Sequence, residues 1–151
     1  MRLSAANLSA LPASVARPGY DRDTRGVGIV HFGIGAFHRA HMAAYTDDAM
    51  AAGEGDWRIL GVSLRSPAVR DQLHPQDGLY TLVERSADGA KARIIGAVAD
   101  VLVASEVRER LVATLAAPTT HIVSFTITEK GYCRASDGSL DLSLADERSA
   151  Y

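Results

Sequence analysis

Three short apolar runs divide the chain, and the segments between them are more polar. The runs cover residues 27–32, 58–64 and 122–127, and most of their positions carry apolar side chains without strict polar alternation. Runs of this length and composition are typical of strands buried on both faces of a parallel sheet. The pattern therefore predicts three buried strands.

The segments between the runs favour helix. Residues 37 to about 51 are rich in helix-forming side chains, and the GEG sequence at 53–55 predicts where that helix ends. A second helix is predicted from residue 105 to about 116, with apolar side chains repeating every four positions. On that helix, Glu106 is spaced to pair with Arg110.

The region between the second and third runs is more varied. A short helix is expected after Ser66 as its cap, with Pro67 at its first position, and His74-Pro75 ends it. Residues 79–85 and 90–97 come next as two strands joined by the turn sequence SADG, which indicates a hairpin.

Together these elements predict an α/β fold. Strands that alternate with helices indicate a Rossmann-like, mostly parallel open sheet with helices on both faces, and the antiparallel hairpin is an insertion in it. Residues 1–26, with two prolines and a charged cluster, are interpreted as a partly helical lead-in and a loop.

Composition narrows the class of protein. The 151 residues are enough for one domain, and they are 47% hydrophobic and 23% charged, as in ordinary globular proteins. With 16 basic and 18 acidic residues, the chain shows no electrostatic preference for nucleic acid or for an anionic membrane. Cys133 is the single cysteine, so it forms no disulfide within the chain and is taken as structural.

The N-terminal segment is faintly similar to a signal peptide but does not have the apolar core of one. Polar residues at positions 4, 7 and 9 interrupt any apolar core there, and no stretch approaches the roughly 20 apolar residues of a membrane span. We therefore expect a cytoplasmic protein.

The first strand leads into the sequence HFGIGAFHRAH at residues 31–41. Gly33 and Gly35 form a G-x-G pair between a predicted strand and a predicted helix. In a dinucleotide-binding turn the first glycine allows a tight bend, and the second lets the backbone approach a diphosphate at the start of the helix. The pair therefore predicts a cofactor site, while a tight turn without a ligand is the alternative.

The third glycine of such a fingerprint is replaced by His38. Alanines along the helix keep that face small, and His38 and Arg39 could donate to the diphosphate from the first turn. A metal site is not expected, because His38 and His41 have no third ligand nearby and Arg39 would repel a cation.

Longer motifs carry a resemblance to a known family. The run G-x-G-x-F-H-R-A-H, the sequence YTD after it, and the stretches GVSLRS, QDGLYTLVER and SFTITEKGYC occur in order along the chain. In these the chain resembles the polyol-specific long-chain dehydrogenases, which include mannitol dehydrogenase, fructuronate reductase and arabinitol dehydrogenase. His38 in place of the third glycine is part of that resemblance.

The resemblance implies a nicotinamide-dependent oxidoreductase that interconverts a polyol or sugar acid and its keto sugar, without a metal. It also implies that residues 1–151 form an incomplete N-terminal NAD(P)-binding Rossmann domain. The catalytic residues and a helical substrate domain of the family lie beyond the matched region, so we assign no catalytic residue and expect no turnover. A non-catalytic dinucleotide-binding module or a truncated relic are the alternatives.

Further cofactor contacts are predicted at the ends of other strands. Thr128, Glu129 and Lys130 come after the third apolar run, and by resemblance their loop borders the nicotinamide. Asp100, after a strand predicted to end at Ala99, is another candidate. Phe37, within the motif of the family, completes the predicted cofactor-binding group.

The choice between NAD and NADP depends on the end of the second strand. An acid there binds the ribose hydroxyls of NAD, whereas a basic residue suits the extra phosphate of NADP. Residues 64–68 read LRSPA, so Arg65, Ser66 and also Arg70 favour NADP on the residues alone. The resemblance favours NAD, with Arg65 stacked on the adenine as an alternative role.

Overall fold

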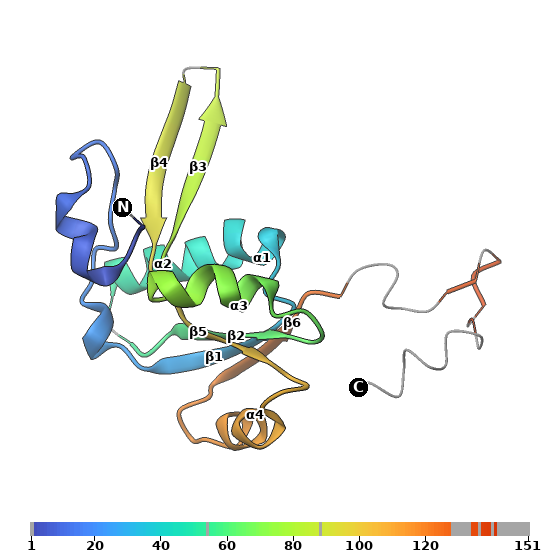
Figure 1. Ribbon diagram of the computed structural model, residues 1–151. Coiled ribbons are helices and arrows are strands. Elements are labelled where there is room, and N and C mark those ends of the chain that lie inside the picture. Colours follow the sequence, from blue (N-terminus) through green and yellow to red (C-terminus); the bar gives the residue numbers. More distant parts are fainter. Residues whose placement is uncertain are drawn as a thin grey trace.

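The computed structural model describes residues 2–53, 55–87, 89–127, 134–135, 137–139 and 141. The predicted site residues Thr128, Glu129 and Lys130, and also Cys133, lie outside the described residues. The described residues form one main sheet with helices packed on it and a separate hairpin (Figure 1).

Four parallel strands form the main sheet. Its order is β5-β2-β1-β6, so β1 and β2 are central and β5 and β6 lie at the edges. The strands are β1 (Val27–Phe32), β2 (Arg58–Ser63), β5 (Val98–Val103) and β6 (Ile122–Phe125). The mostly parallel open sheet predicted from the apolar runs is confirmed.

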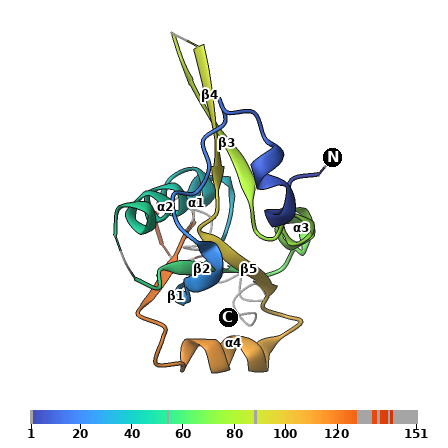
Figure 2. The ribbon, with the colours of Figure 1, turned by 90° about the vertical axis from the view of Figure 1, so that its left-hand side faces the viewer.

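Helices cover both faces of this sheet (Figures 1 and 2). Alternate side chains of β1 face opposite sides, so Ile29 packs in one core cluster and Val30 in the other. Leu111 of α4 packs with the second cluster, while Met50 of α2 and Leu73 of α3 pack with the first. The helices are α1 (Ala36–Ala40), α2 (Met42–Ala52), α3 (Ala68–Leu73) and α4 (Arg108–Leu115).

The hairpin forms a sheet of its own. Strands β3 (Tyr80–Ser86) and β4 (Gly89–Ile95) pair antiparallel and project away from the main sheet (Figure 2). Arg93 of β4 anchors the hairpin to α2, because its Nη1 lies 2.5 Å from Oδ1 of Asp48. The predicted hairpin insertion is therefore confirmed.

Buried polar groups attach the N-terminal lead-in to the core. The Tyr20 hydroxyl donates to Oδ1 of Asp47 at 2.7 Å, and the same oxygen accepts from the Gly96 backbone N–H at 2.8 Å. The buried Arg22 guanidinium donates from Nε to the Gly96 carbonyl at 3.0 Å. Short 3₁₀ turns make up the rest of the irregular structure: Ala5–Ala10, Arg22–Thr24 and His74–Gln76.

Three predicted elements differ from the structure. The helix expected over residues 37–51 is divided at His41, whose φ of −117° and ψ of −82° are not helical. Strand β5 was not among the predicted strands, and the expected strand end at Ala99 is wrong because β5 continues to Val103. The short helix begins at Ala68 rather than at Pro67, although Oγ of Ser66 does accept from the Ala68 N–H.

The edge strand β6 carries exposed apolar side chains. Residues 122, 123, 125 and 127 each expose 40% or more of their surface. Phe125 stacks on Phe32 of β1, with ring centroids 4.8 Å apart. Within the described part of the chain, no helix has the length and apolar character needed to cross a membrane.

Candidate functional site

The order of the strands places a crevice beside β1. The chain goes from β1 to β2 and β5 on one side, and then returns to β6 on the other side. In open α/β sheets, ligands bind where the order reverses, at the carboxyl ends of the strands. The turn that contains Gly33 and Gly35 lies at this end of β1.

Gly33 can only be glycine in this turn. Its φ is +87°, a left-handed conformation that disfavours other residues, and a Cβ atom would lie 2.9 Å from the Thr126 carbonyl oxygen. Its N–H donates to the Val62 carbonyl at 2.9 Å, and the Thr126 N–H donates to Phe32 at the same distance. The turn is therefore fixed from β2 on one side and from the end of β6 on the other.

Gly35 leaves an open space at the start of α1. A Cβ atom there would approach only the Gly33 carbonyl oxygen, at 3.8 Å. The backbone N–H groups of Ala36, Phe37 and His38 meet no acceptor among the residues that the structure describes. Open space in front of unpaired N–H groups fits a diphosphate, so the residues present suit a dinucleotide.

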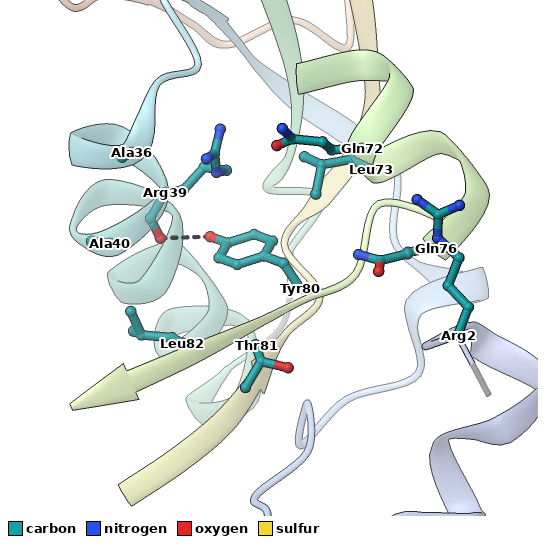
Figure 3. Close-up of a pocket in the computed structure, with 10 residues that line it drawn as sticks. All are labelled: Arg2, Ala36, Arg39, Ala40, Gln72, Leu73, Gln76, Tyr80, Thr81 and Leu82. Atoms are coloured by element: carbon teal, nitrogen blue, oxygen red, sulfur yellow. Dashed lines mark hydrogen bonds between the residues drawn. The ribbon is translucent and has the colours of Figure 1, made fainter. Parts of the chain in front are cut away.

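Arg39 lies at the same turn. Its Nη1 donates to the Ile34 carbonyl at 2.9 Å, and this bond holds the guanidinium beside the glycines. In Figure 3 the side chain extends from α1 into the space that faces Gln72 of α3. This position is compatible with the predicted contact between Arg39 and a diphosphate, which stays a prediction.

A cavity of about 480 Å³ adjoins the turn between α1, α3 and β3 (Figure 3). The Tyr80 hydroxyl closes one side by donating to the Arg39 carbonyl at 2.6 Å, and burial raises the pKa of this hydroxyl. Most of the lining is polar or basic, with no acidic residue: Arg2, Ala36, Arg39, Ala40, Gln72, Leu73, Gln76, Tyr80, Thr81 and Leu82.

His38 faces the interior rather than the crevice. Its ring is 1% exposed and stacks on the His31 ring, with centroids 3.6 Å apart and planes at 16°. Burial, followed by the charges of His31 and Arg39, lowers the pKa of His38 to about 3. The prediction that this ring donates to a diphosphate is therefore wrong, because it is neutral and covered.

His31 is a packed, hydrogen-bonded residue, as predicted. Its Nδ1 lies 2.8 Å from Oγ of Ser124, and its Nε2 lies 3.0 Å from Oγ1 of Thr126. Burial lowers the pKa of this ring as well. The pair of stacked imidazoles thus joins α1 and β1 to β6 directly behind the glycine turn.

Comparison with known proteins agrees with this architecture. The family model of the mannitol dehydrogenase Rossmann domain matches residues 27–147. The chain is 49% identical to the mannitol 2-dehydrogenase of Pyrenophora tritici-repentis over 135 residues, which cover 87% of this chain and 24% of that protein. It is 48% identical to the mannitol 2-dehydrogenase of Aspergillus fumigatus, and this match covers 87% of this chain and 28% of that protein.

The chain belongs to the mannitol dehydrogenase family. The resemblance found in the sequence is therefore confirmed, and with it the assignment to an oxidoreductase family. The chain spans about a quarter of the length of the curated relatives it matches.

Solved members of the mannitol dehydrogenase family share the fold. The Pseudomonas fluorescens mannitol 2-dehydrogenase, in a ternary complex with NAD and D-mannitol, superposes with a TM-score of 0.85. It is 45% identical, and the match covers 95% of this chain and 30% of that one. A substrate-free D-sorbitol dehydrogenase also superposes with a TM-score of 0.85. It is 37% identical, and the match covers 98% of this chain and 32% of that one.

In this mannitol dehydrogenase family chain, the end of β2 is shaped by ion pairs. Arg70, predicted as a contact for NADP, has its Nη2 2.9 Å from Oδ1 of Asp71 and its Nη1 paired with Glu106. The hydrogen bond with Asp71, ahead of that with Glu106, raises the pKa of Arg70. The sequence pairing of Glu106 with Arg110 is wrong, because each of them finds a partner in another element.

Asp100 does not lie at a strand end. It is inside β5, where its carboxylate pairs with Nη2 of Arg110 at 2.8 Å and with Nε2 of His74 at 3.0 Å. The reason for placing it in the cofactor site was the predicted strand end at Ala99, and that prediction is wrong. The structure therefore separates Asp100 from the carboxyl edge of the sheet.

The other predicted contacts are distributed around the crevice. Phe37 is 69% exposed at the start of α1, and its ring lies 4.6 Å from that of His41. Arg65 and Ser66 are exposed after β2. Their contacts with a cofactor stay predictions, as do those of Thr128, Glu129 and Lys130.

The sequence did not reveal two groups that shape this site. The Thr126 carbonyl, which makes glycine necessary at position 33, comes directly after β6, far along the chain from the turn. Glu106 was assigned to its own helix, whereas it pairs with Arg70 across the sheet edge. No local pattern could indicate either contact, because both depend on which strands become neighbours.

Proposed function

We propose that this chain is the cofactor-binding part of an NAD-dependent oxidoreductase that interconverts a polyol and its keto sugar. The observation that carries the proposal is the 45% identity, over 95% of this chain, to a mannitol 2-dehydrogenase in complex with NAD and D-mannitol. The open turn at Gly35 supports it, because it suits the diphosphate of such a cofactor.

The residues of the turn would contact the diphosphate through both backbone and side-chain groups. The N–H groups of Ala36, Phe37 and His38 would donate to the diphosphate, and the Arg39 guanidinium would add a charge-assisted contact. The bound nicotinamide supplies the hydride chemistry. The turn would orient the cofactor, and residues 128–130 would border its nicotinamide half.

NAD is proposed over NADP. The solved relative holds NAD, and Arg70, one of the basic residues predicted to favour NADP, is already paired with two carboxylates.

The test is a calorimetric titration of the purified chain with NADH. We expect binding, and Gly35→Val should weaken it at least about tenfold, because the new side chain enters the space for the diphosphate. Gly35 has φ −76°, which valine adopts freely, so the fold should be kept. The midpoint of urea unfolding checks this.

Gly53→Val is the matched control. A Cβ atom at Gly53 also meets a single carbonyl oxygen at 3.8 Å, that of Ala49, but far along the helix from the turn. This variant should bind NADH like the parent. Equal binding by the parent and Gly35→Val, or no binding by the parent, would contradict the proposal.

A further inference from the structure

An ion pair joins the ends of two neighbouring strands at the cofactor edge. Arg70 is in the short helix α3, shortly after β2, and Glu106 is three residues after β5 ends. The Ala104 N–H donates to the Ser63 carbonyl at 2.9 Å, so the two strands remain paired up to this edge. The Glu106 N–H donates to the Val103 carbonyl at 3.0 Å and fixes the turn that carries the carboxylate.

This position is significant because the carboxyl end of β2 is where the two nicotinamide cofactors are told apart. In dinucleotide-binding sheets, the residue at the end of the second strand meets the ribose of the adenosine half, where an acid favours NAD. Residues 64–68 contain no acid, and they include one arginine. The first carboxylate after β2 in the sequence, that of Asp71, is next to Arg70 in the chain and is bound to it.

We infer that Glu106 selects NAD over NADP by holding Arg70 away from the place of the 2′-phosphate. The inference rests on the proposed function and deepens it. Glu106, three residues after β5, pairs with Arg70 of α3, and in this inference it takes up the guanidinium that a 2′-phosphate would otherwise bind. The residue that determines specificity thus comes after β5 rather than after β2.

Both partners are accessible to a ligand. The Arg70 side chain is 25% exposed and that of Glu106 is 48% exposed, so a cofactor could reach either group without unfolding the edge. Because neither group is fully buried, a 2′-phosphate can reach Arg70, but it must replace the carboxylate that Glu106 already supplies. A 2′-phosphate must therefore compete with Glu106 for Arg70, and it also meets the negative charge of Glu106.

The experiment measures dissociation constants for NADH and NADPH with the full chain. In Glu106→Gln, Arg70 keeps its contact with Asp71 but loses the second carboxylate. We expect the preference for NADH to fall about tenfold through tighter NADPH binding, while NADH binding changes little. Glu109→Gln removes the same charge from the first turn of α4 and should leave both constants unchanged.

A second variant tests whether the effect passes through Arg70. In Arg70→Met combined with Glu106→Gln, the gain in NADPH affinity should disappear, because the guanidinium that Glu106→Gln releases is then absent, while Arg65 is the same in every variant. A preference unchanged by Glu106→Gln, or a gain that persists without Arg70, would overturn the inference. With either of these outcomes, the proposed function still stands as long as the parent chain binds NADH. If the parent chain binds neither NADH nor NADPH, the proposed function and this inference both fail.

Discussion

The carboxyl ends of β1 and of the β2–β5 pair lie on the same edge of the sheet, yet they are built differently. At β1, the conformation of Gly33 and the stacked rings of His31 and His38 are fixed by backbone and buried contacts. At β2 and β5, Arg70 and Glu106 meet as exposed side chains. In the proposals above, the first region holds the dinucleotide and the second sets which of the two dinucleotides is preferred.

The largest expected effect is on the stability of the first region. Gly33→Ala should lower the free energy of unfolding by about 3 kcal/mol, because alanine resists a φ of +87° and its Cβ would lie 2.9 Å from the Thr126 carbonyl oxygen. Urea denaturation followed by circular dichroism measures the change. Gly35→Ala is the control and should cost no more than about 0.5 kcal/mol, as its Cβ enters open space. Similar losses of unfolding free energy for Gly33→Ala and Gly35→Ala would show that the conformation of Gly33 does not fix the first region.

The next effect is a dependence on pH in the same region. The pKa of His38 is lowered to about 3 by burial, so between pH 6.5 and 3 the unfolded chain binds a proton that the folded chain does not. Stability should therefore fall as the pH decreases through this window, by about 2 kcal/mol for this residue at pH 5.

His38→Phe isolates that contribution. Phenylalanine can keep the stacking on His31 but takes up no proton, so the loss of stability from pH 6.5 to pH 5 should be smaller than in the parent. His41→Phe changes an exposed ring at the kink between α1 and α2 and should leave the slope as it is. If both variants had the slope of the parent, the buried pair would have no role in acid sensitivity.

The smallest effect is expected at the second region. Glu106→Gln should leave the midpoint of urea unfolding within measurement error of the parent, since exposed ion pairs contribute little to stability. A clear loss of stability would show that the pair supports the fold, and the contrast between the two regions would then disappear.

Much of the fold was accessible from the sequence. Strand β1 has the predicted bounds, because six consecutive residues between a charged loop and a glycine turn allow only one interpretation. Strand β5 was missed because Gly96 and Ala97 separate it from the hairpin without a recognisable turn sequence. Here the chain passes from one sheet to another through contacts with Arg22 and Asp47, which no local pattern records.

The site was predictable in its backbone but not in its side chains. Glycine spacing indicated the turn correctly, since the conformation required at Gly33 is a local property. The orientation of His38 and the partner of Glu106 depend instead on His31 and Arg70, which reach them only after the sheet has assembled. Spacing along a helix could not distinguish these partners from nearer ones.

The exposed apolar row on β6 has a practical consequence for handling the protein. An edge strand with large apolar side chains offers its backbone to the edges of other copies, and such edges promote aggregation. Dilute samples and a fused solubility partner should therefore limit aggregation during purification.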